Sequence, residues 1–224
     1  MSILIPEQAL HRLIEACLVA VKVDYDENTA NEQNSMLYKF FGGIPQVKNK
    51  FDWFVQAKDL FLRGDRHPRA IDVNMFFNSK RASIPTIHIT LPSEMSKDNG
   101  LGVDAGYQDP LYSDDDTSYQ EVHTRMFDAQ YQILITSDNT LEVQLIYNFM
   151  RAMFISTLDK IDLAGLRNPT LSGQDLRIDS TLIPENIFVR GLGINVNYEI
   201  DVPEFVGKQV IKQLEIGNTT MIDK

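Results

Sequence analysis

Three consecutive aspartates, Asp114, Asp115 and Asp116, form the densest group of metal-ligand atoms in the chain. Carboxylates suit calcium, but a calcium loop spaces them out and adds a turn glycine and a closing glutamate, and that pattern is missing here. Two interpretations stay open: a metal site, or a solvated loop that faces a partner. The sequence favours the second, and no metal or other cofactor is predicted.

The residues that could act as nucleophiles or bases are scattered. His11, His67, His88 and His123 share no motif with each other or with the single cysteine, Cys17. Cys17 lies among apolar residues at helical spacing, which indicates a small buried hydrophobe. Nucleophilic catalysis needs a nucleophile beside a base, and no such pair is indicated. No Gly-rich nucleotide loop, HExxH or nucleophile elbow is present, so the sequence predicts a protein that is not an enzyme.

Charge and composition limit the remaining classes. The formal net charge of −10 argues against a free nucleic-acid binder, because phosphate neutralisation needs clustered Lys and Arg. The only basic cluster, Arg66, His67 and Arg69, is interpreted as a solvated turn before a strand. With 224 residues, 43% of them hydrophobic, the chain can form a substantial core. No signal peptide or membrane-spanning run is visible, so we expect assembly in the cytoplasm and no membrane partner.

The element that must organise this chain covers residues 127–159. A buried strand is predicted over residues 127–136, because apolar residues alternate from residue 131 to residue 136. Ser137-Asp138-Asn139 then favours a helix start, and Asn139 with Glu142 resembles a capping box. From residue 140 the apolar period changes to four, which predicts a helix over residues 140–158. A strand that leads through a capped turn into a long helix is the nucleus of an α/β layer.

Two more helices and three more strands are expected around this nucleus. A helix should begin at Pro6 and continue past Leu18, and a second should lie within residues 48–62, with residues 24–35 as an acidic loop. Alternation predicts strands over residues 69–77, 84–91 and 187–202, the first two joined as an antiparallel hairpin. Residues 162–185 read as an irregular connection with one short helical or extended piece. The fold class is therefore α/β (α+β), an antiparallel or mixed sheet packed with helices.

Residues 92–128 differ in kind from the rest. They hold nine acidic and two basic residues, and so seven of the ten net negative charges. Loops of this length are functional or disordered more often than structural. Tyrosine favours interfaces, so we expect a long acidic arm that contacts neighbouring subunits. The candidate interface residues in this arm are Tyr107, Tyr112, Tyr119, Asp114, Asp115 and Asp116.

We expect one domain over residues 1–224. Residues 1–64 form its helical N-terminal part, residues 65–205 its α/β core with the arm at 92–128, and residues 206–224 a C-terminal tail.

The order of these elements resembles neck and tail-completion proteins of tailed bacteriophages, in particular tail terminators. The stretches that carry the resemblance are residues 84–94 with 98–104, residues 131–136 with Ser137-Asp138-Asn139 and the long helix, and Ser172-Gly173 with 182–185, 187–190 and the final strand. The likeness is at the level of fold.

This resemblance implies a structural virion protein without catalytic residues, which forms a ring at the neck or tail end. The ring would join tail to head as a hexamer, with a dodecamer as the alternative, and would let DNA pass through its lumen without specific binding. Its partners would be other neck, portal-adaptor and tail proteins. The alternative is a soluble cytoplasmic α/β enzyme or regulatory domain whose site carries no recognisable motif.

Overall fold

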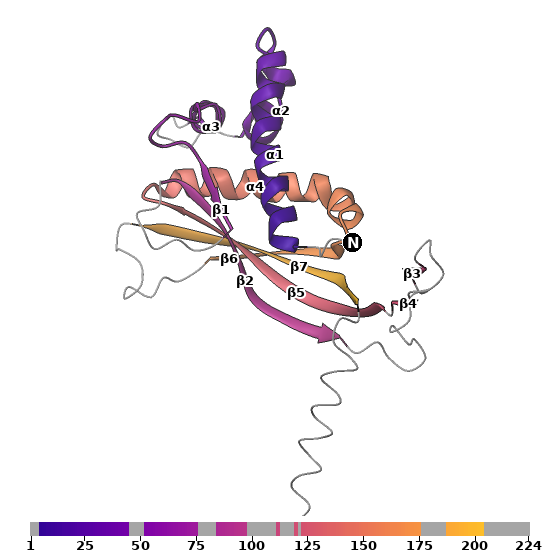
Figure 1. Cartoon of the computed structure of the whole chain (residues 1–224). Coiled ribbons are helices and arrows are strands. Elements are labelled where there is room, and N and C mark those ends of the chain that lie inside the picture. Colours follow the sequence, from indigo (N-terminus) through magenta and orange to yellow (C-terminus); the bar gives the residue numbers. More distant parts are fainter. Residues whose placement is uncertain are drawn as a thin grey trace, which may run out of the picture. The chain divides into compact units, whose positions relative to one another are not determined.

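The computed structural model is described here for residues 5–44, 52–75, 84–97, 111–112, 119–120, 122–175 and 187–203 (Figure 1). Within these residues a mixed five-stranded sheet packs with four α-helices, which confirms the predicted α+β class. The strands follow the order β1-β2-β5-β7-β6. Their bounds are Asp72–Asn74 (β1), Thr86–Lys97 (β2), Val122–Ser137 (β5), Arg167–Asp175 (β6) and Phe188–Pro203 (β7).

The first two strands pair in parallel, so the predicted antiparallel hairpin is wrong. Asp72 lies opposite Thr86 and Asn74 opposite His88. The hairpin was inferred from the short separation of two alternating stretches, and alternation does not determine strand direction. The first strand was predicted over residues 69–77. In the structure it begins at Asp72, so residues 69–71 lie outside it.

The other pairings in the sheet are antiparallel where their register can be followed. The Thr90 hydroxyl in β2 donates to the Gln132 carbonyl in β5, and the Thr136 hydroxyl in β5 donates to the Thr86 carbonyl in β2. Since the start of one strand meets the end of the other, β2 and β5 run antiparallel. Both strands extend into the predicted arm, so residues 92–97 and 122–128 are strand rather than loop.

Among the five strands of the mixed sheet, β6 is the one that the sequence does not predict. Its segment was interpreted as an irregular connection with a short helical or extended piece, and the extended piece is nine residues long and joins the sheet at its edge. Its register with β7 shifts between Arg167 and Thr170, and Asn168 there has a positive φ of 51°. Such a bulge accommodates Pro169, which has no N–H to donate to a sheet ladder.

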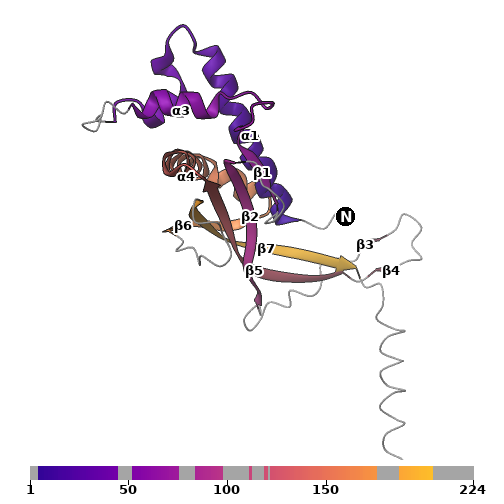
Figure 2. The ribbon, with the colours of Figure 1, turned by 90° about the vertical axis from the view of Figure 1, so that its left-hand side faces the viewer.

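The helices are Pro6–Glu27 (α1), Met36–Phe41 (α2), Trp53–Phe61 (α3) and Thr140–Leu163 (α4). α1 continues to Glu27 and a 3-10 turn covers Glu32–Asn34, so the loop expected over residues 24–35 is largely wrong. Asp24 explains part of this, because its carboxylate accepts a hydrogen bond of 2.6 Å from the Met36 backbone and holds α2 beside α1. Both views place these helices on the same side of the sheet (Figures 1 and 2).

α4 lies between the sheet and α3, and it contacts both β6 and α3. Leu145, Phe149 and Met153 are all buried, as predicted. The partner predicted for them was the last strand, but the ring neighbours of Phe149 are Phe61 at 4.5 Å and Phe40 at 6.2 Å. The core therefore has two apolar layers, one on each side of α4.

The chain groups into two compact units by its contacts. The core unit comprises Ile5–Glu94 and Asp128–Asn197, and the arm unit comprises the described residues of Met95–Phe127 with those that follow Asn197. In the arm unit, Phe127 stacks on Tyr198 with ring centroids 5.7 Å apart. The expected division into residues 1–64, 65–205 and 206–224 stays a prediction, and residues 206–224 lie outside the described part.

Candidate assembly surfaces

Two of the six predicted interface residues lie on described strands of the arm. β3 (Leu111–Tyr112) and β4 (Tyr119–Gln120) form a two-stranded antiparallel ladder in which Tyr112 lies opposite Tyr119. The backbone register thus sets two of the three candidate tyrosines opposite each other, although seven positions separate them in the sequence. Tyr107 and the aspartates Asp114, Asp115 and Asp116 lie outside the described residues.

A cluster of two arginines and two carboxylates, here called the Arg–Glu cluster, lies in the core unit. It consists of Arg63, Arg69, Asp138 and Glu142. Arg69 donates to both oxygens of Asp138, at 2.6 and 3.1 Å, and to Glu142 at 2.6 Å. Arg63 donates to the other Glu142 oxygen at 3.0 Å and to the Arg69 carbonyl at 3.0 Å.

Glu142 is the centre of this cluster. Its side chain is 7% exposed and also accepts the Ser137 hydroxyl at 2.7 Å. Burial raises the pKa of Glu142, but hydrogen bonds from Arg69, Ser137 and Arg63 outweigh it, so the net pKa lies below its ordinary value. The hydrogen bond from Arg69 likewise lowers the pKa of Asp138. Carboxylates held in the charged form by arginines do not act as proton donors near neutral pH, so this geometry suits a clamp rather than acid–base catalysis.

The cluster joins segments that the sequence places far apart. It fastens the α3–β1 connection, which carries Arg63 and Arg69, to the turn between β5 and α4. The basic cluster was interpreted as a solvated turn. That interpretation fits the exposed Arg66 and His67 but is wrong for Arg69. No local signal reveals the pairing, because 73 residues separate Arg69 from Glu142.

At the start of α4, one of the two hydrogen bonds of the predicted capping box is present and the other is not. Asn139 is the N-cap of α4, and its side chain accepts from the Leu141 backbone at 3.0 Å. In a full capping box Glu142 would accept from the Asn139 backbone. Instead the Ser137 hydroxyl accepts that N–H at 3.2 Å, which leaves Glu142 to the two arginines.

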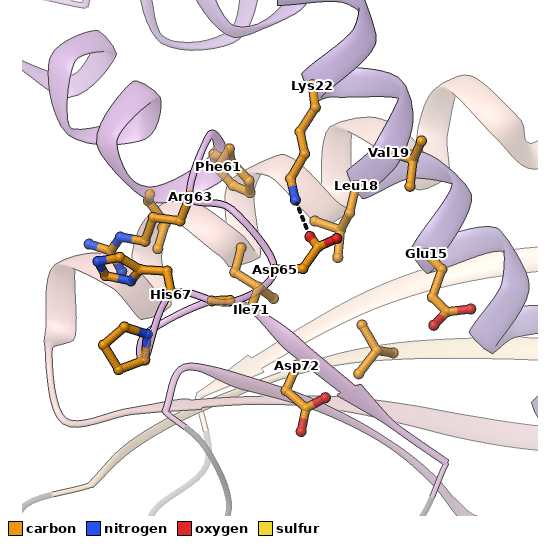
Figure 3. A pocket seen from close by; sticks show the side chains of 14 residues that line it. Glu15, Leu18, Val19, Lys22, Phe61, Arg63, Asp65, His67, Ile71 and Asp72 are labelled. Carbon is orange, nitrogen blue, oxygen red and sulfur yellow. Dashed lines mark hydrogen bonds and ion pairs between the residues drawn. The ribbon is translucent and has the colours of Figure 1, made fainter.

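A cleft of about 660 Å³ lies between α1 and the α3–β1 connection (Figure 3). Its apolar wall includes Leu18, Phe61 and Ile71. The Lys22 ammonium on α1 forms an ion pair with the Asp65 carboxylate, at 2.8 Å between Nζ and Oδ1. The hydrogen bond from Lys22 lowers the pKa of Asp65. Glu15, His67 and Asp72 add polar groups to the lining. These groups do not converge on one point in the manner of a nucleophile with its base, so the cleft is a binding surface at most.

The chemistry-bearing residues singled out in the sequence are dispersed in the structure. Cys17 is 5% exposed, as predicted, and burial raises the pKa of its thiol. His88 is buried in β2, while His67 is exposed on the α3–β1 connection. Among the described residues no group of three or more His, Cys, Asp or Glu side chains could hold a metal ion. No helix in the described part of the chain is long and apolar enough to cross a membrane.

One further surface escaped the sequence reasoning. The side of α1 that faces away from the core carries two exposed valines, Val19 and Val23. They were passed over because the buried stripe of α1 accounts for the helix pattern by itself.

No protein-family model and no curated protein matches the chain.

Proposed function

We propose that this chain is a structural subunit of a tailed-bacteriophage virion, a tail terminator or head–tail connector. It forms a homo-oligomeric ring, a hexamer or alternatively a dodecamer, at the neck or tail end. The ring joins tail to head, contacts portal-adaptor and tail proteins, and lets DNA pass. It requires no cofactor and performs no catalysis.

The observation that carries this proposal is the arm. Residues Met95–Phe127 group by their contacts apart from the core unit. β2 and β5 run without a break from core residues into arm residues, and in the segment between them β3 pairs with β4 so that Tyr112 lies opposite Tyr119. A separate unit that carries tyrosines suits contacts between subunits, because tyrosine is enriched at interfaces.

The charge of the arm supports passage of DNA rather than its capture. Nine acidic and two basic residues lie in residues 92–128. Sequence-independent DNA binding strengthens as Lys and Arg neutralise phosphates, so an acidic lining holds DNA weakly. Like charges also repel, with salt screening beyond about 8–10 Å.

Deleting residues 100–117 tests the arm. Intact protein should form rings that are visible by negative-stain electron microscopy and have a hexamer or dodecamer mass by mass photometry. The deleted protein should keep a cooperative thermal transition but remain below ring mass. A Val55→Ser variant is the matched control, because Val55 is 51% exposed on α3, outside the arm. Normal rings from the deleted protein would remove the arm from assembly, and intact protein that never forms rings would overturn the proposed function.

Replacing Asp114, Asp115 and Asp116 with asparagine separates two placements of the arm. If the aspartates face the lumen, neutralisation should raise nonspecific DNA retention at low salt. If they face a basic partner ring, it should weaken docking to that partner. A triple variant that changes neither property would assign these residues to a solvated loop.

The cleft beside α1 favours a second candidate, a soluble enzyme or regulatory domain. Its volume of about 660 Å³ falls within the range of small-molecule sites. A metabolite library screened by thermal shift tests this candidate, with Leu18→Trp as the variant that fills the cleft. A ligand that stabilises the intact protein and not the filled variant would favour it over the ring.

A further inference from the structure

The outward side of α1 carries an apolar stripe, defined here as Ala16, Val19, Ala20 and Val23. Their spacing of three, one and three residues places them on one face of the helix. Val19 is 58% exposed and Val23 50% exposed, so the stripe is open to solvent in the single chain. It lines a shallow groove that Met36 of α2 borders on one side.

The buried side of α1 shows that the stripe is surplus to the fold. Leu10, Ile14, Cys17, Val21 and Tyr25 form the buried line of the helix. The stripe lies on a different face from this buried line, and Val19 at its edge also borders the cleft between α1 and the α3–β1 connection (Figure 3). Half or more of each valine remains exposed in the single chain, so burying the rest requires a second surface.

Two opposite charges lie at the ends of the stripe. Arg12 is four residues before Ala16, and Glu27 is four residues after Val23. Both side chains are exposed, and neither has an ion-pair partner among the described residues. The groove has two other acids, and both already have partners: Asp24 accepts hydrogen bonds from Met36 and Asn28, and Glu15 lies 3.3 Å from the His11 ring.

These six residues are arranged symmetrically about the point midway between Val19 and Ala20. Arg12 and Glu27 are equidistant from that point, as are Ala16 and Val23. If a second α1 lies antiparallel across the stripe, Arg12 meets Glu27 twice, and each valine meets an alanine. Pairing a small with a larger side chain allows close helix packing. A parallel arrangement would instead set Arg12 against Arg12 and Glu27 against Glu27.

We propose that the partner of this stripe is a second copy of the same chain, packed α1 against α1 in antiparallel orientation about a two-fold axis. An isologous contact requires a self-complementary surface, and the stripe with its two terminal charges has this property. The contact differs from one within a cyclic ring, because neighbours in such a ring are not related by a two-fold axis. It joins two free subunits or two rings, so it goes beyond the proposed function and does not depend on it.

Charge reversal tests the geometry on the full chain. Arg12→Glu or Glu27→Arg alone creates two like-charge contacts in the pair and should weaken self-association about tenfold by sedimentation equilibrium. The antiparallel pair also predicts the result of mixing variants. When Arg12→Glu protein is mixed with Glu27→Arg protein, position 12 of each copy meets the opposite charge at position 27 of the other, so both ion pairs form. The mixture, and the double variant R12E/E27R, should therefore associate within about twofold of the original protein.

Cysteine cross-linking tests the two-fold axis separately. Two copies of Val19 lie beside the axis, so Val19→Cys should give a covalent dimer under mild oxidation. Val55→Cys, at a similarly exposed position on α3, is the matched control and should give far less. The native Cys17 is 5% exposed and is present in every variant, so the original protein gives the background level of disulfide cross-linking.

The results that would contradict the α1 pair differ from those that would contradict the proposed ring. Equal cross-linking at positions 19 and 55, or single charge reversals that associate as well as the original protein, would overturn the α1 pair. Neither result bears on rings formed through the arm. Retained far-UV circular dichroism in each variant shows that weaker association is not loss of folding, since all of the altered side chains are exposed.

Discussion

The two long helices of the core unit are similar in length but differ in how their surfaces are used. α4 has 24 residues, and side chains on nearly every side of it are buried. α1 has 22 residues, and its buried side chains follow a single line. A helix that is apolar all round must lie inside, whereas a helix with one apolar line leaves the rest of its surface for other uses. α4 is therefore scaffold, and α1 is both scaffold and a surface for a partner.

Their charged residues differ in the same way. Glu142 on α4 is almost enclosed and is held by two arginines and a serine hydroxyl. Lys22 on α1 makes one ion pair, with Asp65, whose side chain is 94% exposed. A buried carboxylate without partners is strongly destabilising, but an exposed ion pair contributes little. The charged contacts of the two helices thus contribute unequally to the free energy of folding.

The largest difference between the helices should appear on truncating Phe149. Its side chain is fully buried between Phe61 and Phe40, so Phe149→Ala should lower the free energy of unfolding by about 3–5 kcal/mol. Urea denaturation measures this. Ile155→Ala on the exposed side of α4 is the control and should change it by less than about 0.5 kcal/mol. An unchanged midpoint for Phe149→Ala would show that α4 is not enclosed.

The Arg–Glu cluster should give the next largest effect. Glu142→Gln keeps the side-chain size but loses the charge, and it should cost about 1.5–3 kcal/mol at pH 7. Glu15→Gln on α1, where the side chain is 56% exposed, should cost much less. Equal losses at the two positions would contradict the contrast between the helices.

The same cluster predicts a pH dependence. The pKa of Glu142 is lowered in the folded state, so its contribution is full above the unfolded pKa of about 4.3 and is lost as pH falls through the lower folded value. The stability gap between the original protein and Glu142→Gln should therefore narrow as pH drops below about 4.5. Chemical denaturation at pH 7 and at about pH 3 measures the gap. A constant gap would exclude the charge of Glu142 as its source.

The helix starts should differ by a smaller amount. Asn139→Ala removes the side-chain cap of α4 and should cost about 1 kcal/mol. Ile5→Ala, at the N-cap of α1, removes no cap hydrogen bond, because that helix begins with a proline and no capping side chain. The N-terminal proline already supplies the preferred φ without a donor. Thermal melting of both variants, compared with the original protein, should separate them.

The smallest effect should come from the ion pair beside the cleft. Lys22→Ala should leave the melting temperature unchanged within measurement error, because its partner Asp65 is solvent-exposed and surface pairs contribute little. Repeating the melt at high salt should not change this result. A clear loss of stability would mean that the pair closes the cleft and holds α1 in place.

Elements whose pattern is local could be predicted from the sequence, and elements decided by distant partners could not. The period-four stripe gave α4, and alternation gave β2, β5 and β7. β6 was missed because Pro169 and Gly173 interrupt its pattern. In the fold Pro169 lies in a bulge at the sheet edge, and at Gly173 a Cβ atom would approach the Tyr147 hydroxyl to within 2.0 Å. Both breakers have reasons that only the packed structure supplies.

The candidate surfaces also differ in whether a local pattern in the sequence indicates them. The tyrosines of the arm were identified from composition, and the ladder then placed Tyr112 opposite Tyr119. The Arg–Glu cluster was not foreseen, since Arg63 lies 79 residues from Glu142. The parallel direction of β1 and the aromatic partners of Phe149 were not foreseen either.

By itself, the sequence determined where α4 and most strands of the mixed sheet form, which side chains of α4 turn inward, and that the arm is acidic. Those properties follow from the free energies of neighbouring residues and from the period of apolar side chains. Tertiary structure alone decided strand direction, the partner of each buried charge and the faces of α1 that stay open. Each of these depends on residues that are distant in the chain and adjacent only after folding, so no local pattern could contain them.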